Sequence, residues 1–409
     1  VALGGYFMEV AGWERAHGYA ANEETLLAKY RNQVPVREAE WDGRHFWEVS
    51  NAEQLAMSEG VGMINLSHFA IFDVEGADAE GLMEYLSVAK VGADTAIGKG
   101  VYTHFLDHAG GIRSDLTIIR LAEDCFRVVC GGDTGHRDYI WMRDMSGRKG
   151  FANVTFHDRS EELATLGLWG PEARVTLAKL MDDPESISNE SFPFATTKEI
   201  TVCGVKVWAF RISYVGEQGW ELYFPFSDGL AIWDALFKLR VTPVGIETYA
   251  NSRRLEKSLR LQNADLEIDY NLYEAGLARP KVKAADFHGK EAYVQQRELD
   301  EQAAYLCTFV LQDTTDSNGV VRYPVGNWPI LDPASKDVII DAHGRRSYTT
   351  SMAFGPSLGV NIAMGYLPTN KAKEGDTVLI EYFGEHYEAK VMKVGYGAVL
   401  DPTNERPKS

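Results

Sequence analysis

Gly110-Gly111-Ile112-Arg113-Ser114-Asp115-Leu116 is the stretch that decides how this chain folds. The run before it, residues 100–106, alternates with period two, and residues 116–121 after it are β-branched and apolar. Two such runs joined through a double glycine predict a β-hairpin with Asp115 just past its turn. A carboxylate delivered in this way to the start of a strand is a candidate for chemistry. The alternative is that Asp115 caps the turn by accepting hydrogen bonds from backbone amides.

A second hairpin is predicted between residues 211 and 222, where two extended runs flank a glycine-rich turn. Tyr214 and Glu221 lie seven residues apart, with the turn at residues 215–219 between them. A tyrosine offers a flat wall with a polar tip, and a carboxylate accepts two N–H donors at once. The alternative is a tyrosine at a strand edge and an exposed glutamate.

The composition limits the class of protein. The 409 residues are 45% hydrophobic and 24% charged, which is ordinary for a soluble globular chain of two or three domains. The formal net charge of -18 argues against broad binding to a phosphate backbone, so no nucleic-acid partner is expected. Residues 1–5 lack the features of a signal peptide, and no run approaches the ~20 apolar residues of a membrane span. We therefore expect no membrane association and a cytoplasmic location.

The order of the periodic runs predicts an α+β fold in three parts. Residues 1–50, rich in aromatic and charged side chains, predict an arm that packs on a neighbour. Residues 51–300 mix helices and strands, and residues 301–409 show alternating strands with glycine turns, typical of a small antiparallel barrel or sandwich. In the mixed part, the expected helices cover residues 52–59, 77–86, 230–239 and 248–261, and the expected strands cover residues 63–74, 166–169, 197–203 and 205–212.

Short motifs spread over nearly the whole chain carry a resemblance to a known family. They are Gly12-Trp13-Glu14-Arg15, the stretch from Gly111 to Leu116, Leu168-Trp169-Gly170-Pro171-Glu172-Ala173-Arg174, the stretch from Tyr214 to Glu221, Arg254-Leu255-Glu256-Lys257, Tyr273-Glu274-Ala275-Gly276-Leu277, Asp286-Phe287-His288-Gly289-Lys290-Glu291-Ala292, and Asn361-Ile362-Ala363-Met364-Gly365-Tyr366. In this order they make the chain similar to the folate-binding aminomethyltransferase family, whose founding member is the glycine-cleavage T-protein. Within that family the chain most resembles the C-terminal, folate-binding half of dimethylglycine and sarcosine dehydrogenases. The resemblance implies a three-domain, T-protein-like architecture, with two intertwined α+β subdomains in residues 51–300, and tetrahydrofolate as cofactor.

The resemblance also implies roles for single residues. Asp115 matches an aspartate beside the N10 side of tetrahydrofolate, where a carboxylate stabilises an iminium-like cation or relays a proton. Tyr214 and Glu221 match positions that contact the pterin ring. Tyr102 resembles a second aromatic wall of the folate slot, or else it is a tyrosine of the core. Glu256 matches a recurrent acid of the family, or else it pairs with an arginine on a helix surface.

No metal site is predicted. His104 and His108 stand four residues apart, as metal-binding histidines do on a helix, but here they fall across a strand and its turn. Residues 92–100 have the wrong spacing for a phosphate loop, and nothing near residue 1 matches the dinucleotide fingerprint. No flavin-binding half is therefore expected within these residues.

One segment departs from the T-protein pattern. The T-protein commonly has an Ala-Arg-Asp run just before its Ser-Leu-Arg-Leu-Glu motif, whereas this chain has Tyr249-Ala250-Asn251 before Ser252. The basic residue near the folate is missing here, as it is in the dehydrogenase branch. This departure weakens the case for transfer from a lipoyl-bound aminomethyl group and favours a dehydrogenase-like role.

The resulting prediction is an enzyme for tetrahydrofolate-dependent one-carbon transfer. It would capture the carbon released by demethylation of a methylated amine, as iminium or formaldehyde, and form 5,10-methylenetetrahydrofolate. Two alternatives are a demethylase that moves an intact methyl group to give 5-methyltetrahydrofolate, and a non-catalytic folate-binding subunit. Because no redox centre is expected in this chain, the oxidation implies a redox or metal-bearing partner subunit or fused domain.

Overall fold

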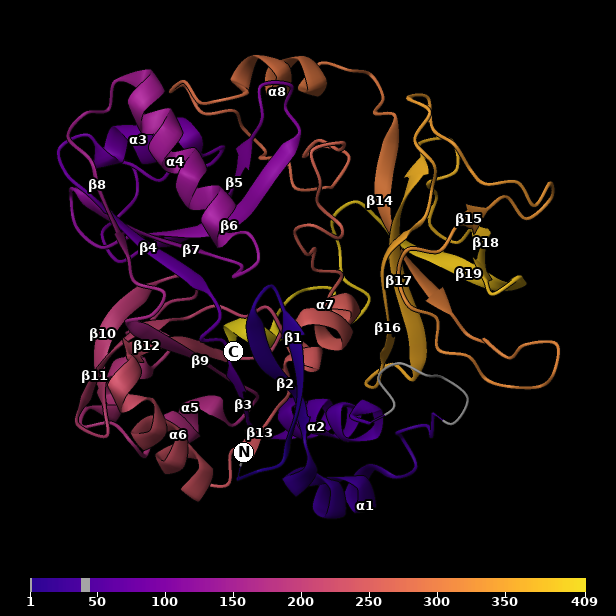
Figure 1. Ribbon diagram of the computed structural model, residues 1–409, viewed down its shortest axis with the longest axis horizontal. Coiled ribbons are helices and arrows are strands. Elements are labelled where there is room, and N and C mark those ends of the chain that lie inside the picture. Colours follow the sequence, from indigo (N-terminus) through magenta and orange to yellow (C-terminus); the bar gives the residue numbers. More distant parts are fainter. Residues whose placement is uncertain (1, 38–44) are drawn as a thin grey trace.

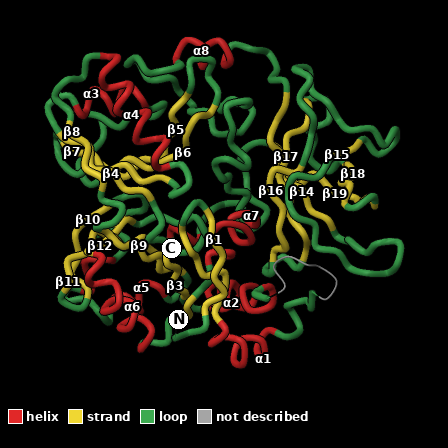
Figure 2. Tube along the Cα trace, in the orientation of Figure 1, coloured by secondary structure: helices red, strands yellow, loops and turns green. Residues whose placement is uncertain are grey.

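Three β-sheets and one short hairpin form the framework of the computed structural model, which describes residues 2–37 and 45–409. A five-stranded sheet lies at the upper left of Figure 1, a six-stranded sheet at the lower left, and a second six-stranded sheet on the right. Helices group around the two left-hand sheets, whereas loops border the right-hand sheet (Figure 2). This mixture of helix and sheet confirms the expected α+β class.

The five-stranded sheet carries the first predicted hairpin. Its strand order is β5-β6-β7-β4-β8, and all neighbours are antiparallel. Its strands are β4 (Ala70–Glu75), β5 (Gly100–Leu106), β6 (Ile112–Arg120), β7 (Cys125–Cys130) and β8 (Thr155–Asp158). Helices α3 (Ala79–Leu86) and α4 (Gly135–Lys149) pack on it, and Leu82, Met83 and Leu86 are buried in its core. The helix expected over residues 77–86 is confirmed, and α4 was not predicted.

The position of Asp115 in this hairpin differs from the expectation. Strand β6 begins at Ile112, so Asp115 lies inside the strand, opposite His104, and not just past the turn. The turn itself is capped by Asp107, whose Oδ1 accepts hydrogen bonds from the amides of Ala109 and Gly111 at 2.9 and 2.8 Å. The turn-capping role considered for Asp115 therefore belongs to Asp107.

Both glycines of the deciding stretch have a physical reason. Gly110 has a φ of +82°, which favours glycine over residues with a Cβ. A Cβ at Gly111 would lie 2.1 Å from the carbonyl oxygen of Ile268, because that segment passes directly over the hairpin. The double glycine thus closes the turn and admits a distant part of the chain.

The six-stranded sheet at the lower left of Figure 1, called the central sheet below, has the order β10-β11-β12-β9-β3-β13. Only its β13–β3 pair is parallel. Its strands are β3 (Gly62–Asn65), β9 (Leu163–Trp169), β10 (Thr197–Val202), β11 (Val205–Phe210), β12 (Gly219–Pro225) and β13 (Thr242–Pro243). Its helices are α5 (Ala173–Ala178) and α6 (Gly229–Lys238). The run expected as strands over residues 63–74 therefore supplies two sheets, because β3 joins this one and β4 joins the five-stranded one.

The helix expected over residues 248–261 is wrong in its second half. The chain forms a π-helical turn, η5 (Thr248–Ser252), followed by the short α7 (Arg253–Glu256), and no helix continues to residue 261. Every side chain of α7 is buried, including two arginines and a glutamate. An amphipathic helix would expose its polar face to solvent, whereas the polar residues of α7 are enclosed by protein.

The C-terminal six-stranded sheet confirms the strands expected beyond residue 301. Its order is β15-β18-β19-β14-β17-β16, and all neighbours are antiparallel. Its strands are β14 (Ala304–Leu311), β15 (Ile330–Leu331), β16 (Thr349–Gly355), β17 (Val360–Pro368), β18 (Thr377–Tyr382) and β19 (Glu385–Val394). Helix α8 (Lys290–Arg297) lies between this sheet and the five-stranded one (Figure 1).

Residues 2–37 form more regular structure than an arm suggests. The hairpin β1 (Gly5–Val10) and β2 (Trp13–Tyr19) lies near the middle of the view in Figure 1. It leads into the short α1 (Ala28–Tyr30), and α2 (Trp47–Glu59) extends the helix expected over residues 52–59. The remaining short helices are η1 (Ala20–Asn22), η2 (Glu23–Leu27), η3 (Pro184–Ile187), η4 (Phe226–Asp228) and η6 (Arg406–Lys408). Among the described residues, no helix is long and apolar enough to cross a membrane.

Candidate active site

The register of β5 against β6 brings three polar side chains together. Tyr102 and His104 are two residues apart and so share a face of β5, and Asp115 lies opposite His104 on β6. The Tyr102 hydroxyl donates a hydrogen bond of 3.1 Å to Asp115 Oδ2. His104 Nε2 lies 3.2 Å from the same hydroxyl oxygen. These contacts form a chain that runs from the histidine through the tyrosine to the carboxylate.

The proton positions in this chain follow from its surroundings. Burial, together with the guanidinium groups of Arg279 and Arg260, lowers the pKa of His104 to about 3, so the imidazole is neutral. The Tyr102 hydroxyl has one proton, which it donates to Asp115, and it therefore accepts from the N–H at His104 Nε2. His104 Nδ1 is then an unprotonated acceptor, and no described residue donates to this buried atom.

Asp115 has the electrostatics of a group that exchanges protons near neutral pH. Burial raises the pKa of its carboxyl to about 6, and the negative charges of Asp138 and Asp133 also raise it. The hydrogen bond from Tyr102 lowers this pKa, because it stabilises the ionised form. A carboxyl with this pKa is mostly ionised at neutral pH and accepts a proton at low cost.

Tyr102 is accessible although protein surrounds it. The residue keeps 38% of its surface exposed, more than any other member of the histidine–tyrosine–aspartate chain. Desolvation nevertheless raises the pKa of its phenol well above the usual value. Tyr102 is therefore open to a small molecule on one side and enclosed by protein on the others.

Two more tyrosines lie beside this group. Tyr214 sits in the irregular connection between β11 and β12, and its hydroxyl donates to the carbonyl of Arg260 at 2.5 Å. The ring of Tyr249, from η5, lies 4.9 Å from the ring of Tyr214 between centroids. The charge of Asp115 raises the pKa of both phenols, although burial is the largest cause. Aromatic walls from two separate segments therefore meet near Asp115.

Glu221 completes the group from the middle of the central sheet. It lies on β12, pairs with Phe210 and Gly167 on the two neighbouring strands, and is buried. Burial raises the pKa of its carboxyl to about 7, and it also raises the pKa of Tyr249 through its charge. Among the described residues its side chain accepts one hydrogen bond, from the Tyr223 hydroxyl. One carboxylate oxygen therefore has acceptor capacity left.

The structure does not bring Glu256 to this group. Its Oε2 accepts hydrogen bonds from Gln54 and Arg253 at 2.9 and 2.6 Å, and its Oε1 accepts one from the amide of Ser357 at 2.7 Å. The residue is completely buried. The ion pair with Arg253 was the alternative considered from the sequence, but it lies in the interior and not on a helix surface. These contacts join α2, α7 and the loop after β16.

Two family models match this chain. A family model described as the GCVT N-terminal domain matches residues 1–283, and one described as the glycine cleavage T-protein C-terminal barrel domain matches residues 329–394. The chain belongs to the glycine cleavage T-protein family. This family is tetrahydrofolate-dependent. The membership confirms the resemblance inferred from the short motifs.

Three relatives describe the place of the chain in the family. An aminomethyltransferase of Herpetosiphon aurantiacus is 31% identical over 348 residues, which are 84% of this chain and 89% of that protein. The mitochondrial dimethylglycine dehydrogenase of Rattus norvegicus is 29% identical over 403 residues, 97% of this chain, but the chain spans only 43% of that relative. The crystal structure of glycine cleavage system aminomethyltransferase T from Bartonella henselae has a TM-score of 0.76 at 23% identity and covers 96% of this chain, which itself covers 94% of that structure. This last likeness confirms the fold.

The residues of this T-protein family member fit tetrahydrofolate. Glu221 has a free acceptor for the N–H donors of a pterin, and the rings of Tyr214 and Tyr249 provide flat walls. Asp115 offers a carboxylate with one hydrogen-bond donor, Tyr102, and capacity for another. The sequence interpretation missed Tyr249, and it considered His104 only as a metal ligand. The period-two alternation of residues 100–106 already placed His104 on the same face as Tyr102.

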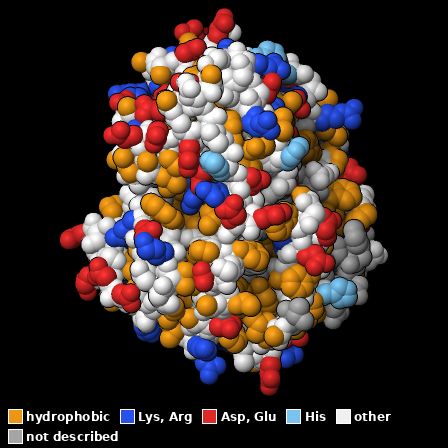
Figure 3. Space-filling view, turned by 60° about the vertical axis from the view of Figure 1, so that its left-hand side comes forward, with side chains coloured by type: hydrophobic (Ala, Val, Ile, Leu, Met, Phe, Trp, Pro, Cys, Tyr) orange, Lys and Arg blue, Asp and Glu red, His pale blue; other side chains and the backbone are white. Residues whose placement is uncertain are grey.

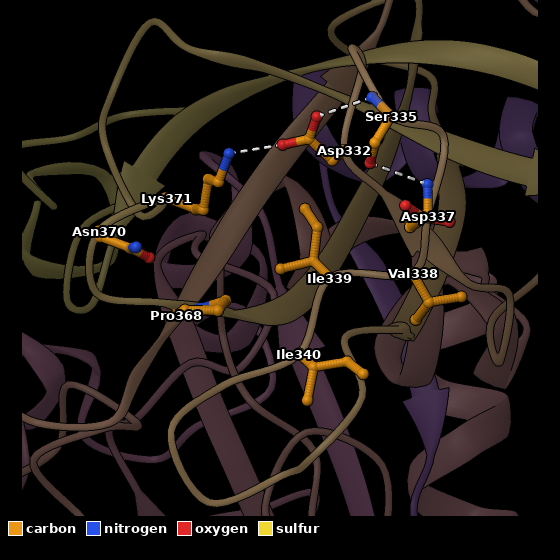
Figure 4. Close-up of a pocket in the computed structure, with 9 residues that line it drawn as sticks. All are labelled: Asp332, Ser335, Asp337, Val338, Ile339, Ile340, Pro368, Asn370 and Lys371. Atoms are coloured by element: carbon orange, nitrogen blue, oxygen red, sulfur yellow. Dashed lines mark hydrogen bonds and ion pairs between the residues drawn. The ribbon is translucent and has the colours of Figure 1, made fainter.

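A shallow pocket of about 210 Å³ lies apart from this site, in the C-terminal part of the chain (Figure 4). Lys371 and Asp332 form an ion pair there, and Asp332 also accepts from the amide of Ser335. Lys371 and Asp332 thus satisfy each other. On the face shown in Figure 3, Lys and Arg side chains are interspersed with Asp and Glu. Neither feature competes with the Asp115 group as a site for chemistry.

Proposed function

We propose that the chain captures the carbon released by demethylation of a methylated amine and forms 5,10-methylenetetrahydrofolate. The observation that carries this proposal is the hydrogen bond from Tyr102 to Asp115, which gives one carboxylate, with a pKa of about 6, a fixed position. Support for the dehydrogenase-like branch comes from dimethylglycine dehydrogenase, which aligns with 97% of this chain.

The segment that departs from the T-protein pattern supports the same branch. Asn251 stands where that pattern has its aspartate, and Ala250 replaces the arginine before it. The Asn251 amide donates to both oxygens of Glu247, at 3.0 and 2.9 Å, and His17 also contacts Glu247, at 3.2 Å. Asn251 is therefore a neutral, internally satisfied amide, and Ala250 supplies no cation where the T-protein pattern has its arginine.

Tetrahydrofolate, when bound, supplies the nitrogens N5 and N10 between which a one-carbon unit is held. Asp115 is ionised in most molecules at neutral pH, because its pKa of about 6 lies below that pH. Its negative charge stabilises a positive charge that develops beside it, and its oxygen accepts the proton that an amine loses when it bonds to carbon. Both roles need the charge as well as the position of the carboxylate.

Tyr102 and His104 hold the carboxylate in place for this work. The N–H of His104 donates to the Tyr102 oxygen and so directs the Tyr102 proton toward Asp115. Because Tyr102 donates to Oδ2, the other oxygen of Asp115 is left to accept the proton. When Asp115 takes up a proton, the hydrogen bond from Tyr102 favours its release again, since that bond stabilises the ionised form.

The two classes of product distinguish this proposal from a methyl-transferring demethylase. The protein would be incubated with tetrahydrofolate and ¹³C-formaldehyde, and the labelled carbon followed by NMR against the uncatalysed reaction. The proposal predicts formation of the methylene product above that background. Formation at the background rate, or a requirement for an intact methyl donor with label at the methyl level, would contradict it.

A further inference from the structure

Arg279 approaches the same site from the segment between β13 and α8. Its guanidinium donates a hydrogen bond to the carbonyl oxygen of Tyr102, and its backbone amide donates to the Tyr293 hydroxyl at 2.8 Å. Burial lowers the pKa of Arg279, whereas the phenols of Tyr102 and Tyr293 raise it. Arg279 forms no ion pair with any residue that the structure describes. A half-buried guanidinium is therefore held at Tyr102 without a carboxylate.

Arg260 is a second guanidinium that acts on Tyr102 and His104. Its three nitrogens donate to the backbone carbonyls of Ala275, Ser258 and Gly395, and the residue is buried. The carboxylate that raises the pKa of Arg260, Asp265, is already used by other groups. Asp265 forms an ion pair with Arg254 at 2.5 Å and accepts further hydrogen bonds from Thr350 and from the amide of Leu261. Arg260 is thus satisfied in hydrogen bonds but not in charge.

The charges around Tyr102 do not balance. Arg279 and Arg260 both lower the pKa of His104, so both lie close to it, while His104 itself is neutral. Asp115 is the carboxylate that acts on Tyr102. Among the described residues, neither guanidinium group has a carboxylate as an ion-pair partner, although the formal net charge of the chain is -18. Buried charges are ordinarily paired, so this region has room for one more anionic group.

Contacts and electrostatic effects also connect the polar groups of the site in one series. Glu221 acts on Tyr249, Tyr249 and Tyr214 adjoin Asp115, and Asp115 contacts Tyr102. Arg279 then contacts Tyr102 through its carbonyl. The chemical groups of tetrahydrofolate have the same order, from the N–H donors of the pterin through N5 and N10 to the carboxylates of the glutamyl tail. The guanidinium stands where that order places a carboxylate.

We propose that Arg279, backed by Arg260, is a carboxylate-binding subsite beside Tyr102, and that it takes the glutamyl carboxylate of the folate tail. The inference rests on the proposed function. A guanidinium binds a carboxylate through short, charge-assisted hydrogen bonds, and a partly enclosed site strengthens them. The carboxylate of an amino-acid substrate has the same chemistry and is the other source that the test must separate.

The test compares two ligands and three proteins by calorimetry. The ligands are 5-formyltetrahydrofolate and 5-formyltetrahydropteroate, which lacks the glutamate. The proteins are the parent, Arg279→Gln, and Arg297→Gln as the matched control, because Arg297 is an exposed arginine that donates to the backbone carbonyls of Arg279 and Pro280. We expect the parent and the control to bind the complete ligand about tenfold or more tightly than the truncated one, the scale of a hydrogen bond between charged groups.

In Arg279→Gln the ratio of the affinities for the complete and the truncated ligand should fall toward one, because only the complete ligand loses a partner. Equal binding of the two ligands by the parent, combined with a loss of N,N-dimethylglycine binding but not dimethylamine binding in Arg279→Gln, would assign the subsite to an amino-acid carboxylate. An unchanged preference, or equal weakening of both pterin ligands, would overturn the subsite. Failure of the parent to bind either pterin would instead contradict the proposed function.

Discussion

The hydroxyl of Tyr102 donates to Asp115 across the β5–β6 pair, and the hydrogen bond measures 3.1 Å. The bond both holds the carboxylate in position and lowers its pKa, because it favours the ionised form that burial disfavours. Its two residues come from the two strands of the hairpin that the double glycine closes. The chemistry proposed for the chain therefore depends on a local feature of its sequence.

Removing the Tyr102 hydroxyl should move the pH dependence of the reaction upward. The ionised form of Asp115 is the active one, so kcat/KM should rise with pH through about 6 in the parent. Tyr102→Phe deletes the bond that lowers this pKa, and the rising limb should shift to higher pH. Profiles of kcat/KM measured from about pH 5 to about pH 8 check this shift. A limb that stayed in place would mean that another group controls the rate.

A change at Asp133 should move the same limb the other way. Asp133 is exposed, accepts a hydrogen bond from Asn263, and raises the pKa of Asp115 through its negative charge. Asp133→Asn removes that charge without touching the site, so the limb should shift to lower pH. The shift should be smaller than that in Tyr102→Phe and should shrink as salt is added, because exposed charges are screened. A shift to higher pH would contradict the electrostatic account.

Glu221→Gln should weaken folate binding about tenfold or more, because it replaces a charge-assisted hydrogen bond with a neutral one. Calorimetry with 5-formyltetrahydrofolate measures the loss. Tyr223→Phe keeps the side chain of Glu221 but removes the hydrogen bond that lowers its pKa, so this variant tests the charge of Glu221 separately from its position. Unchanged affinity in Glu221→Gln would remove this residue from the site.

Glu256→Gln should act on stability and not on folate. The substitution leaves the buried Arg253 with one carboxylate partner, Glu217, and removes one charge from a buried ion-pair network. Breaking such a network costs about 3 kcal/mol or more of the free energy of unfolding. Urea denaturation measures this loss, and the folded variant should bind 5-formyltetrahydrofolate as the parent does. Selective loss of folate affinity at full stability would return Glu256 to the cofactor site.

The parts of the fold that depend on nearby residues were predictable from the sequence, and the parts that depend on distant contacts were not. The β5–β6 hairpin, with both of its strands, was predictable because the alternation and the double glycine lie within about twenty residues. The depth of Asp115 in β6 was not, because Asp107 takes the capping role that the turn requires. The sequence pattern offers two aspartates for one turn and does not choose between them.

The errors elsewhere have the same origin. Residues 248–261 have helical periodicity, but Glu256 is held by Gln54 and Ser357, which lie about 200 residues before it and about 100 after it. These distant contacts bury the polar residues of α7 and end the helix early. Arg279 belongs to no motif, and it contacts Tyr102 across a sequence separation of 177. No local pattern reports such contacts.

The most direct test of the central claim is the rate of methylenetetrahydrofolate formation by Asp115→Asn, corrected for the uncatalysed reaction with formaldehyde. Asparagine keeps the shape of the side chain and still accepts from Tyr102, but it neither carries the negative charge nor takes up a proton at neutral pH. We predict that the variant binds 5-formyltetrahydrofolate nearly as well as the parent and forms product at least about a hundredfold more slowly. Retention of most of the parent's rate above background would contradict the account, because Asp115 would then have no catalytic role.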